Sequence, residues 1–184
     1  MKEGKFSKLW DQTSDPVFFW KPVHKNGWLS NWYPVKFMED GVTYTSTEQY
    51  FMIKKAELFS SSSEAAAETN KKIIKKMLES DDQSEIRTLG RKVVGFDETI
   101  WKKNRLQIMI NANMLKFTQN TKLLKKLLST VNLLLVEASP SDAIWGIGLA
   151  ENKAIEVDMS DWPGENFLGF SLMVVRDALF EIYS

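Results

Sequence analysis

The sequence contains no cysteine and a single histidine, His24. A chain without cysteine forms no disulfide, offers no thiolate nucleophile and builds no cysteine metal site. One histidine alone does not make a transition-metal centre. We therefore expect no metal and no cofactor. The lack of disulfides suits a reducing compartment, and a cytoplasmic protein is expected.

Long apolar runs and an excess of one charge are also absent. No stretch approaches the roughly 18 consecutive apolar residues of a membrane span, and the first six residues lack the apolar centre of a signal peptide. The 24 lysines and arginines balance 24 aspartates and glutamates, so no global field draws the chain to nucleic acid or to an anionic membrane. We expect no membrane partner, and any contact with phosphate must be local.

What is present favours one folded domain. A chain of 184 residues with 43% hydrophobic content can bury one sizeable core. Residues 1–16 are polar and irregular and are predicted to be a peripheral extension, with the domain spanning residues 17–184. The seven tryptophans suit either a core or a stacking platform for a planar ligand, and core is the commoner role.

Short strand patterns and longer helical patterns occur along the chain. Strands are predicted at Val17–Trp20 and Leu133–Val136, and residues 35–44 read as a β-hairpin that turns at Asp40-Gly41. Helices are predicted from about residue 47, over Glu64–Ser80, Ile86–Val94, Glu98–Gln119 and Thr121–Ser129, and after Asn166, a natural N-cap.

The helix after the hairpin carries the first candidate site residue. If Thr45 is its N-cap, Glu48 belongs to a capping box and its carboxylate turns back onto the backbone. If Ser46 is the N-cap, Gln49 closes the box and Glu48 points outward. Periodicity does not choose between the two, and a first-turn acid is the commoner role for Glu48.

Lys55 stands seven residues after Glu48 in the same helix. At about 100° per residue the two side chains point to nearly the same side, with their Cα atoms about 10 Å apart along the axis. A sugar-sized group fits in that space. The neighbouring Lys54 is rotated about 100° away from Lys55.

Other polar residues have both a structural and a functional interpretation. Arg105 lies on the apolar stripe of the Glu98–Gln119 helix, where an arginine either extends to solvent or binds an anion. The lysine cluster at residues 71–76 is more simply a solvated face. The buried strand at Leu133–Val136 runs into a loop with an acid, a tryptophan and two glycines, which is a common place for a site.

The order of several short motifs resembles the NADAR superfamily, the YbiA-like N-glycosidases, from about Phe19 to Leu179. The matching blocks are Leu29-Ser30-Asn31-Trp32-Tyr33-Pro34; Asp40-Gly41 through Ser46-x-Glu48-x-Tyr50-Phe51 to Lys55-Ala56; Gly90-Arg91 with Trp101; Lys116-Phe117; Val136-Glu137 with Asp142-x-x-Trp145-Gly146-x-Gly148; and Gly164-Glu165-Asn166 through Leu168-Gly169 to Arg176. Each block alone is weak, but their order and spacing make chance agreement improbable.

The resemblance implies an α+β, predominantly helical fold. It would be a single YbiA-like domain with a small N-terminal β-hairpin and short strands packed on a helical bundle. The family hydrolyses N-glycosidic bonds of ribosylamine phosphate intermediates of riboflavin biosynthesis, or removes ADP-ribose from guanine bases of nucleic acid. The substrates expected from this resemblance are therefore ADP-ribose or ribosylated bases, with ADP-ribosylated DNA or RNA among them.

The resemblance also implies site residues. Glu48 and Lys55 become the principal catalytic pair, with Ser46 favoured as the N-cap, and Asp142 is a further catalytic candidate. The substrate-binding candidates are Asn31, Trp32, Trp101, Arg105, Trp145, Gly146, Gly148 and Asn166. Among these, Trp32 and Trp145 are expected to stack on planar rings, and Arg105 with the backbone N–H groups of residues 146–148 to hold phosphate.

A carboxylate and an amine permit a specific route to cleavage. Glu48 can move a proton at the sugar or base, and Lys55 can take over C1 of the opened ribose as a Schiff base, provided that burial or a nearby cation lowers its pKa. The alternative from a different class is a non-catalytic module that binds ADP-ribose or an NAD metabolite.

Overall fold

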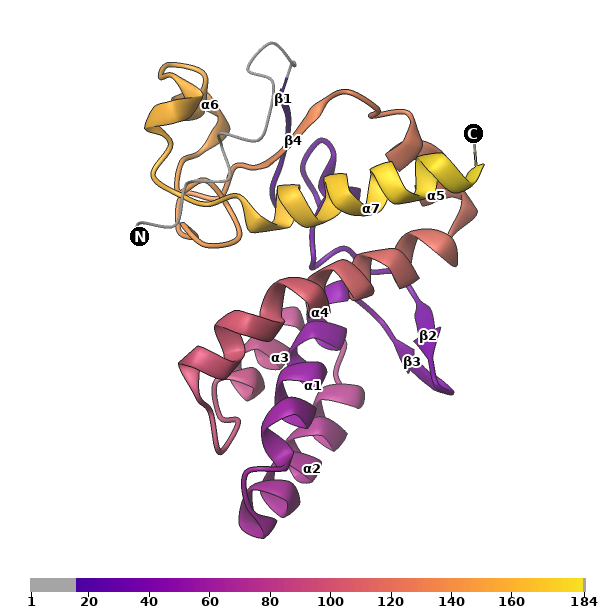
Figure 1. Ribbon diagram of the computed structural model, residues 1–184, viewed down its shortest axis with the longest axis vertical. Helices are drawn as coiled ribbons and strands as arrows, with labels where there is room; N and C mark the ends of the chain where they lie inside the picture. Colours follow the sequence, from indigo (N-terminus) through magenta and orange to yellow (C-terminus); the bar gives the residue numbers. More distant parts are fainter. Residues whose placement is uncertain (1–15, 184) are drawn as a thin grey trace. The chain divides into compact units, whose positions relative to one another are not determined.

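The computed structural model describes residues 16–183, which form two compact units (Figure 1). Within the described residues, the first unit combines residues 16–30 with residues 121–183, and the second is Asn31–Asn120. Most of the predicted extension at residues 1–16 lies outside the described residues, and Pro16 opens the first strand. Each unit is described by itself.

The second unit is a helical bundle entered through a hairpin. Its elements are β2 (Phe37–Glu39), β3 (Val42–Tyr44), α1 (Thr47–Ser60), α2 (Glu64–Leu78), α3 (Gln83–Gly90) and α4 (Glu98–Thr118). Strands β2 and β3 pair antiparallel, as predicted, and β3 leads directly into α1. Helix α1 contacts α2, α3 and α4, so it is the central helix of this unit (Figure 1).

Three aromatic side chains fix the hairpin to α1. The rings of Tyr44 and Tyr50 meet edge to face at 4.9 Å, and the ring of Phe37 stacks on Tyr44 at 5.8 Å. All three side chains are at most 3% exposed. Burying an aromatic side chain contributes about 1.5–3 kcal/mol, so this cluster holds the chain that enters α1 in one place.

Helix α3 differs from its prediction at both ends. It begins three residues earlier than expected because the Oδ1 atom of Asp82 accepts hydrogen bonds from the N–H groups of Ser84 and Glu85. It ends at Gly90, where an added Cβ would collide with the sulfur of Met52. The stretch to Val94 predicted as helical is therefore turn and loop.

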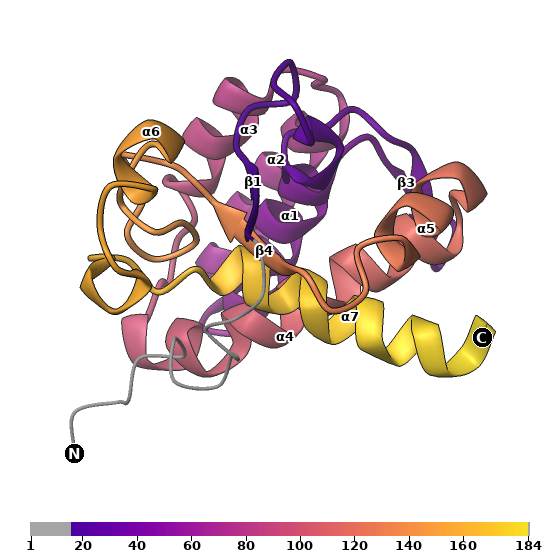
Figure 2. The ribbon, with the colours of Figure 1, turned by 90° about the horizontal axis from the view of Figure 1, so that it is seen from above.

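The first unit is built on two short parallel strands. Strand β1 (Pro16–Phe19) pairs with β4 (Leu134–Glu137), joining segments far apart in sequence (Figure 2). Helix α7 (Phe167–Tyr183) packs on β4 and also contacts α5 (Thr121–Leu128). Three short helical turns complete this unit, at Gly27–Leu29, α6 (Glu151–Ala154) and Met159–Asp161, and none of them was predicted.

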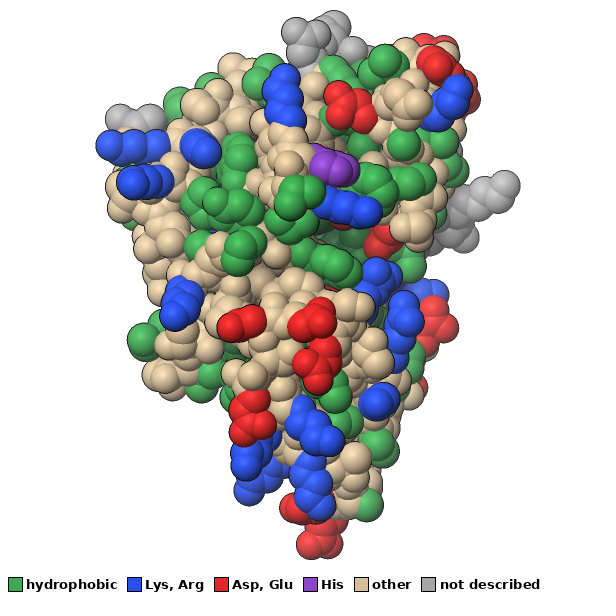
Figure 3. Space-filling view, turned by 180° about the vertical axis from the view of Figure 1, so that it is seen from behind, with side chains coloured by type: hydrophobic (Ala, Val, Ile, Leu, Met, Phe, Trp, Pro, Cys, Tyr) green, Lys and Arg blue, Asp and Glu red, His purple; other side chains and the backbone are tan. Residues whose placement is uncertain are grey.

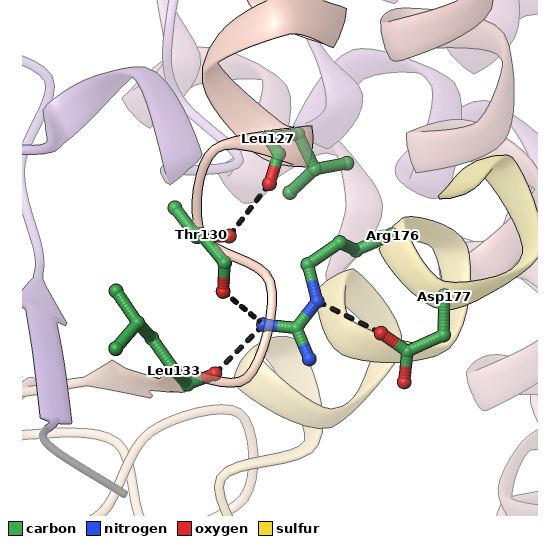
Figure 4. Close-up of polar contacts among 5 residues, drawn as sticks. All are labelled: Leu127, Thr130, Leu133, Arg176 and Asp177. Carbon is green, nitrogen blue, oxygen red and sulfur yellow. Dashed lines mark hydrogen bonds and ion pairs between the residues drawn. The ribbon is translucent and has the colours of Figure 1, made fainter. Parts of the chain in front are cut away.

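A buried arginine fastens α7 to the turn between α5 and β4 (Figure 4). The Nη1 atom of Arg176 donates to the carbonyl oxygens of Thr130 and Leu133, each at 2.7 Å. Its Nε atom donates to Asp177 at 2.8 Å. Arg176 is only 5% exposed, so these bonds satisfy carbonyl groups that water cannot freely reach. Within residues 16–183, no helix has the length and apolar character to cross a membrane.

Candidate active site

The start of α1 decides between the two capping alternatives. The Oγ atom of Ser46 accepts a hydrogen bond from the backbone N–H of Gln49 at 3.0 Å, which makes Ser46 the N-cap. The Oε1 atom of Gln49 in turn accepts from the N–H of Thr45 at 2.8 Å. Gln49 is therefore the third residue of the helix, its side chain turned back to the backbone before the helix, and Glu48 is the second residue.

Glu48 is buried at this helix start, next to a predicted substrate-binding residue. Glu48 is only 5% exposed, and its backbone N–H donates to the carbonyl oxygen of Asn31 at 3.0 Å. Asn31 is 9% exposed, and its Oδ1 atom has no hydrogen-bond partner among the described residues. The partial positive charge of the helix N-terminus stabilises a carboxylate here.

The amine of Lys55 lies partly buried between aromatic rings. Its Nζ atom donates to the carbonyl oxygen of Gly90 at 2.9 Å and stands 4.6 Å from the ring centroid of Phe96 and 5.6 Å from that of Trp101. Burial lowers the pKa of Lys55, and the positive charge of Arg91 lowers it further. No ion pair among the described residues includes Lys55. Burial and the charge of Arg91 both increase the neutral, nucleophilic fraction of the Lys55 amine.

The neighbouring Lys54 has the opposite surroundings. Its Nζ atom makes ion pairs with Glu39 and Glu57, each at 2.9 Å, and stands 5.3 Å from the ring of Tyr50. Burial by itself would lower the pKa of Lys54, but the two carboxylates together raise that pKa above its ordinary value. Lys54 is thus held in its charged form, whereas Lys55 is biased toward the neutral one.

Phe51 connects the two predicted catalytic residues along α1. Residues 48, 51 and 55 are spaced three and four apart, which places them on one side of the helix. The ring of Trp101 from α4 packs on Phe51 at 4.9 Å. The predicted residue Arg105 follows one turn later on α4 and is partly buried, as is Trp32 beside Asn31. This stripe of α1 therefore has an acid at one end, an amine at the other and an aromatic wall.

Lys116 is a buried amine that the sequence analysis did not single out as a site residue. It is 0% exposed on α4, and its Nζ atom stands 5.7 Å from the ring of Tyr33 and 5.2 Å from that of Phe117. Burial lowers its pKa to about 7. The sequence gives little sign of this burial, because a lysine on a helix is usually exposed to solvent.

The remaining predicted residues lie in the loop after β4 in the first unit. The Oδ1 atom of Asp142 accepts from the N–H groups of Ile144 and Trp145 at 2.9 and 2.8 Å, so this carboxylate shapes its own turn. The ring of Trp145 is partly buried and meets Phe167 edge to face at 6.1 Å. The catalytic prediction for Asp142 remains a prediction.

Backbone hydrogen bonds close this loop and occupy N–H groups that were expected to hold phosphate. The N–H of Ile147 donates to the carbonyl of Glu137 at 3.0 Å, and that of Gly148 to the carbonyl of Asp142 at 3.1 Å. Two of the three N–H groups expected to hold phosphate are therefore occupied inside the loop. An added Cβ on Gly146 would stand 2.8 Å from the Glu137 carbonyl, so glycine here permits a close backbone approach.

The side chain of Asn166 makes structural hydrogen bonds. Its Oδ1 atom accepts from the N–H of Glu137 at 3.0 Å, and its Nδ2 atom donates to the carbonyl of Leu135 at 2.9 Å. The side chain thus bonds to strand β4 instead of capping α7. Its backbone has a positive φ of 54°, a conformation that asparagine tolerates better than most residues.

The candidate residues therefore form two groups, one in each unit. Asn31, Trp32, Glu48, Lys55, Trp101 and Arg105 belong to the second unit, and Asp142, Trp145, Gly146, Gly148 and Asn166 to the first. Within residues 16–183, no cluster of three or more histidines or carboxylates could hold a metal ion.

Comparison with known proteins identifies the family. A model of the NADAR domain matches residues 18–180. This chain belongs to the NADAR domain family. The NADAR chain is 43% identical over 154 residues to N-glycosidase R617 of Acanthamoeba polyphaga mimivirus, an alignment that covers 81% of this chain and 85% of that protein. It is 30% identical over 166 residues to riboflavin biosynthesis protein VVA0006 of Vibrio vulnificus, covering 90% of this chain and 39% of that longer protein.

A solved structure supports the fold of the NADAR chain. The NMR structure of the Escherichia coli protein YbiA superposes with a TM-score of 0.70 at 24% identity, covering 93% of this chain and 89% of that one. The predominantly helical, YbiA-like α+β fold predicted from the sequence is therefore confirmed.

Proposed function

We propose that this N-glycosidase cleaves the bond between C1 of a ribose and the nitrogen of a base, using Glu48 as acid and base and Lys55 as nucleophile. The substrate is either an ADP-ribosylated guanine, in nucleic acid or as a nucleotide, or a ribosylaminopyrimidine phosphate. The names of the viral and bacterial relatives support the reaction class and the second substrate, respectively.

The observation that carries the proposal is the contrast between adjacent lysines of α1. Lys54 is ion-paired to two carboxylates, whereas the amine of Lys55 lies against Phe96 and Trp101 and donates to a neutral carbonyl oxygen. A carbonyl accepts a hydrogen bond from an amine in either protonation state. The hydrogen bond to Gly90 therefore holds the Lys55 amine in place whether or not the amine carries a charge.

The chemistry balances through a Schiff base. Opening of the ribose ring turns C1 into an imine of the base nitrogen. The Lys55 amine adds to C1, the C1–N bond to the base breaks, and the base leaves with a proton. Water then adds to the Lys55 imine, which releases the sugar and regenerates the amine. Glu48 transfers the protons that these steps require.

The environment of Glu48 suits a proton carrier. Glu48 is 5% exposed, so burial disfavours the charge of its carboxylate, while the start of α1 favours it. A group that acts first as an acid and then as a base takes up both protonation states during turnover. The partly buried ring of Trp101, which packs on Phe51, offers a surface for the planar base.

The test compares two substrates and three variants. Release of free base is measured from ADP-ribosylated guanine in an oligonucleotide and from a ribosylaminopyrimidine phosphate. Glu48→Gln and Lys55→Ala are expected to abolish release from the preferred substrate while keeping the far-UV circular dichroism of the parent. Lys54→Ala is the matched control and is expected to retain activity within a few-fold.

Reduction with borohydride during turnover detects the covalent step. Mass spectrometry of the wild-type chain is expected to show one ribosyl adduct on the peptide containing Lys55, and none in Lys55→Ala. Near wild-type turnover in both catalytic variants would refute the proposal. Tight ADP-ribose binding by calorimetry without hydrolysis of either substrate would identify a binding module instead.

A further inference from the structure

A buried asparagine of α2, Asn70, is not among the candidate residues named above. Within Glu64–Leu78 the buried side chains are Ala66, Asn70, Ile73 and Met77, of which Asn70 alone is polar. The exposed face of the helix is charged, and Figure 3 shows blue and red side chains gathered at the end of the second unit where α2 lies. Burying an amide is costly unless the amide is hydrogen-bonded, so its partners indicate what it holds in place.

Asn70 pairs with both backbone groups of one residue in the loop between α3 and α4. Its Oδ1 atom accepts from the N–H of Val94 at 2.9 Å, and its Nδ2 atom donates to the carbonyl of Val94 at 3.0 Å. The same Nδ2 atom also donates to the carbonyl of Ala56 in α1 at 3.3 Å. One side chain that is 0% exposed therefore fastens residues 91–97 to α1. We call these residues the 91–97 loop.

The 91–97 loop also packs on the end of α1. Val93 is buried in one cluster with Phe59, and the ring of Phe96 meets that of Phe59 edge to face at 5.3 Å. Gly95 has a positive φ of 79°, and an added Cβ there would collide with the Oγ atom of Ser62, in the turn after α1. Hydrogen bonds, apolar contacts and a close backbone approach thus hold the loop in one place.

The 91–97 loop and the residue before it supply much of what surrounds the Lys55 amine. The carbonyl of Gly90 accepts the hydrogen bond from Nζ at 2.9 Å, and the ring of Phe96 stands 4.6 Å from Nζ. Arg91 contributes the charge that, together with burial, lowers the pKa of Lys55. Ion pairs occupy several other charges of α1, α2 and α4, namely Lys54 with Glu57, Lys72 with Glu68 and Lys102 with Glu98. The reactivity of the amine therefore depends on where this loop lies.

We propose that Asn70 is a positioning residue for the reaction, which holds the 91–97 loop on α1 so that Phe96 and Arg91 stay beside the Lys55 amine. This inference rests on the proposed function, because that function makes Lys55 the nucleophile. Asn70 is fully buried, so it acts through the loop and not on the substrate. Its two hydrogen bonds to Val94 are the means by which it does so.

Loss of the Asn70 amide changes the surroundings of the amine in a defined direction. The N–H and carbonyl groups of Val94 lose their partner, and they regain hydrogen bonds when the loop moves out toward water. Water then reaches the Lys55 amine, and the charge of Arg91 is no longer held near it. Both changes raise the pKa of Lys55, so the neutral fraction of the amine falls at a given pH.

The first experiment measures the pH dependence of catalysis in Asn70→Leu. Leucine has nearly the same volume as asparagine and removes the hydrogen bonds to Val94 and Ala56. We expect the rising limb of kcat/KM to move up by about one pH unit, which lowers kcat/KM about tenfold on the acid side of the limb. A wild-type limb in a folded Asn70→Leu chain would overturn the inference.

A double-mutant cycle with Arg91→Gln tests whether Asn70 acts through the loop. Arg91→Gln alone is expected to move the limb to higher pH because it removes a positive charge. In the Asn70→Leu background the same substitution is expected to shift the limb by less than about half as much, because the loop no longer holds Arg91 near the amine. Full additivity of the two shifts would overturn the inference, since independent sites add.

Two further variants separate this role from a general loss of stability. Met77→Ala truncates a fully buried side chain of the same helix, in a different apolar cluster from that of Val93, and is expected to lower the urea midpoint without moving the limb. Gly95→Ala strains the loop at its positive φ and pushes it away from Ser62, so the limb is expected to move as in Asn70→Leu. Gly95→Ala carries the test if Asn70→Leu does not fold. An equal shift in Met77→Ala, or none in Gly95→Ala, would overturn the inference.

Labelling without substrate separates this inference from the proposed function. Reductive dimethylation with formaldehyde and cyanoborohydride modifies neutral amines, and tandem mass spectrometry distinguishes Lys55 from Lys54 within one peptide. The pH at which Lys55 is labelled is expected to rise in Asn70→Leu, while that of the ion-paired Lys54 stays unchanged. No change at Lys55, with Lys55→Ala inactive, defeats only the role of Asn70. A rise at Lys55, with Lys55→Ala fully active, defeats the proposed mechanism and leaves Asn70 as the residue that positions the amine.

Discussion

The Nζ atom of Lys55 donates a hydrogen bond to the carbonyl oxygen of Gly90 at 2.9 Å, which ties the middle of α1 to the end of α3. That carbonyl is available because α3 ends there, where close packing against Met52 favours glycine. The position of a candidate nucleophile is thus set by the end of a different helix. Gly90→Ala is expected to disturb the Lys55 amine through Met52.

The first prediction concerns Arg91 and the pH dependence of the reaction. Burial and the charge of Arg91 lower the pKa of Lys55, and the neutral amine is the reactive form, so activity rises with pH through the pKa of Lys55. Removing this cation in Arg91→Gln raises the pKa of Lys55 and moves the rising limb of kcat/KM to higher pH. Arg91→Lys keeps the charge and is expected to retain the wild-type profile. Superimposable profiles for all three chains would contradict the prediction.

The second prediction concerns the glycine at the end of α3. Gly90→Ala places a methyl group against the flexible side chain of Met52, which must move. We expect a loss of stability of about 1–3 kcal/mol from overpacking, measured by urea denaturation. The double variant Gly90→Ala/Met52→Ala provides the space and is expected to recover part of the activity that Gly90→Ala removes. No recovery, with the fold intact, would show that Met52 does not transmit the effect.

The third prediction concerns the buried arginine of α7. Replacing Arg176 by methionine leaves the carbonyl groups of Thr130 and Leu133 without their shared donor. We expect the free energy of unfolding to fall by about 2–4 kcal/mol. The exposed Arg87 of α3 is the control, and Arg87→Met is expected to change stability by less than about 0.5 kcal/mol. Equal urea midpoints for the two variants would count against this role of Arg176.

The fourth prediction concerns Lys116 and stability. Burial lowers its pKa in the folded chain to about 7, whereas an unfolded lysine has a pKa of about 10.4. Between these pH values the unfolded chain binds more protons, so stability rises with pH by up to about 1.4 kcal/mol per unit. Below pH 7 both states are protonated and the contribution is constant.

Lys116→Met keeps most of the buried volume and removes the titrating group. Its free energy of unfolding is expected to exceed that of the wild type most at and below pH 7, and the difference is expected to shrink toward pH 10. Urea denaturation of both chains at several pH values provides the measurement. A difference that does not vary with pH would show that Lys116 titrates normally in the folded chain.

Local patterns were sufficient for much of the fold. Alternating β-branched and aromatic residues around Asp40-Gly41 predicted the β2–β3 hairpin, and Asp97 correctly predicted the start of α4. The predicted end of α3 at Val94 was wrong, because the helix stops at Gly90 and residues 91–94 form a turn and a loop. The short helical turns in the first unit were missed because they have too few residues for a periodic pattern.

The sequence by itself determined the family, the helical α+β character and the candidate residues Glu48 and Lys55, because motif order and residue spacing are properties of the chain alone. Only the tertiary structure decided that Ser46 caps α1 and that Asn166 bonds to β4. It also decided that, among residues 16–183, Lys54 is ion-paired while Lys55 is not. The physical reason is that hydrogen bonds, burial and local charge come from elements distant in sequence. The protonation state of an amine depends on those neighbours and not on its place in a motif.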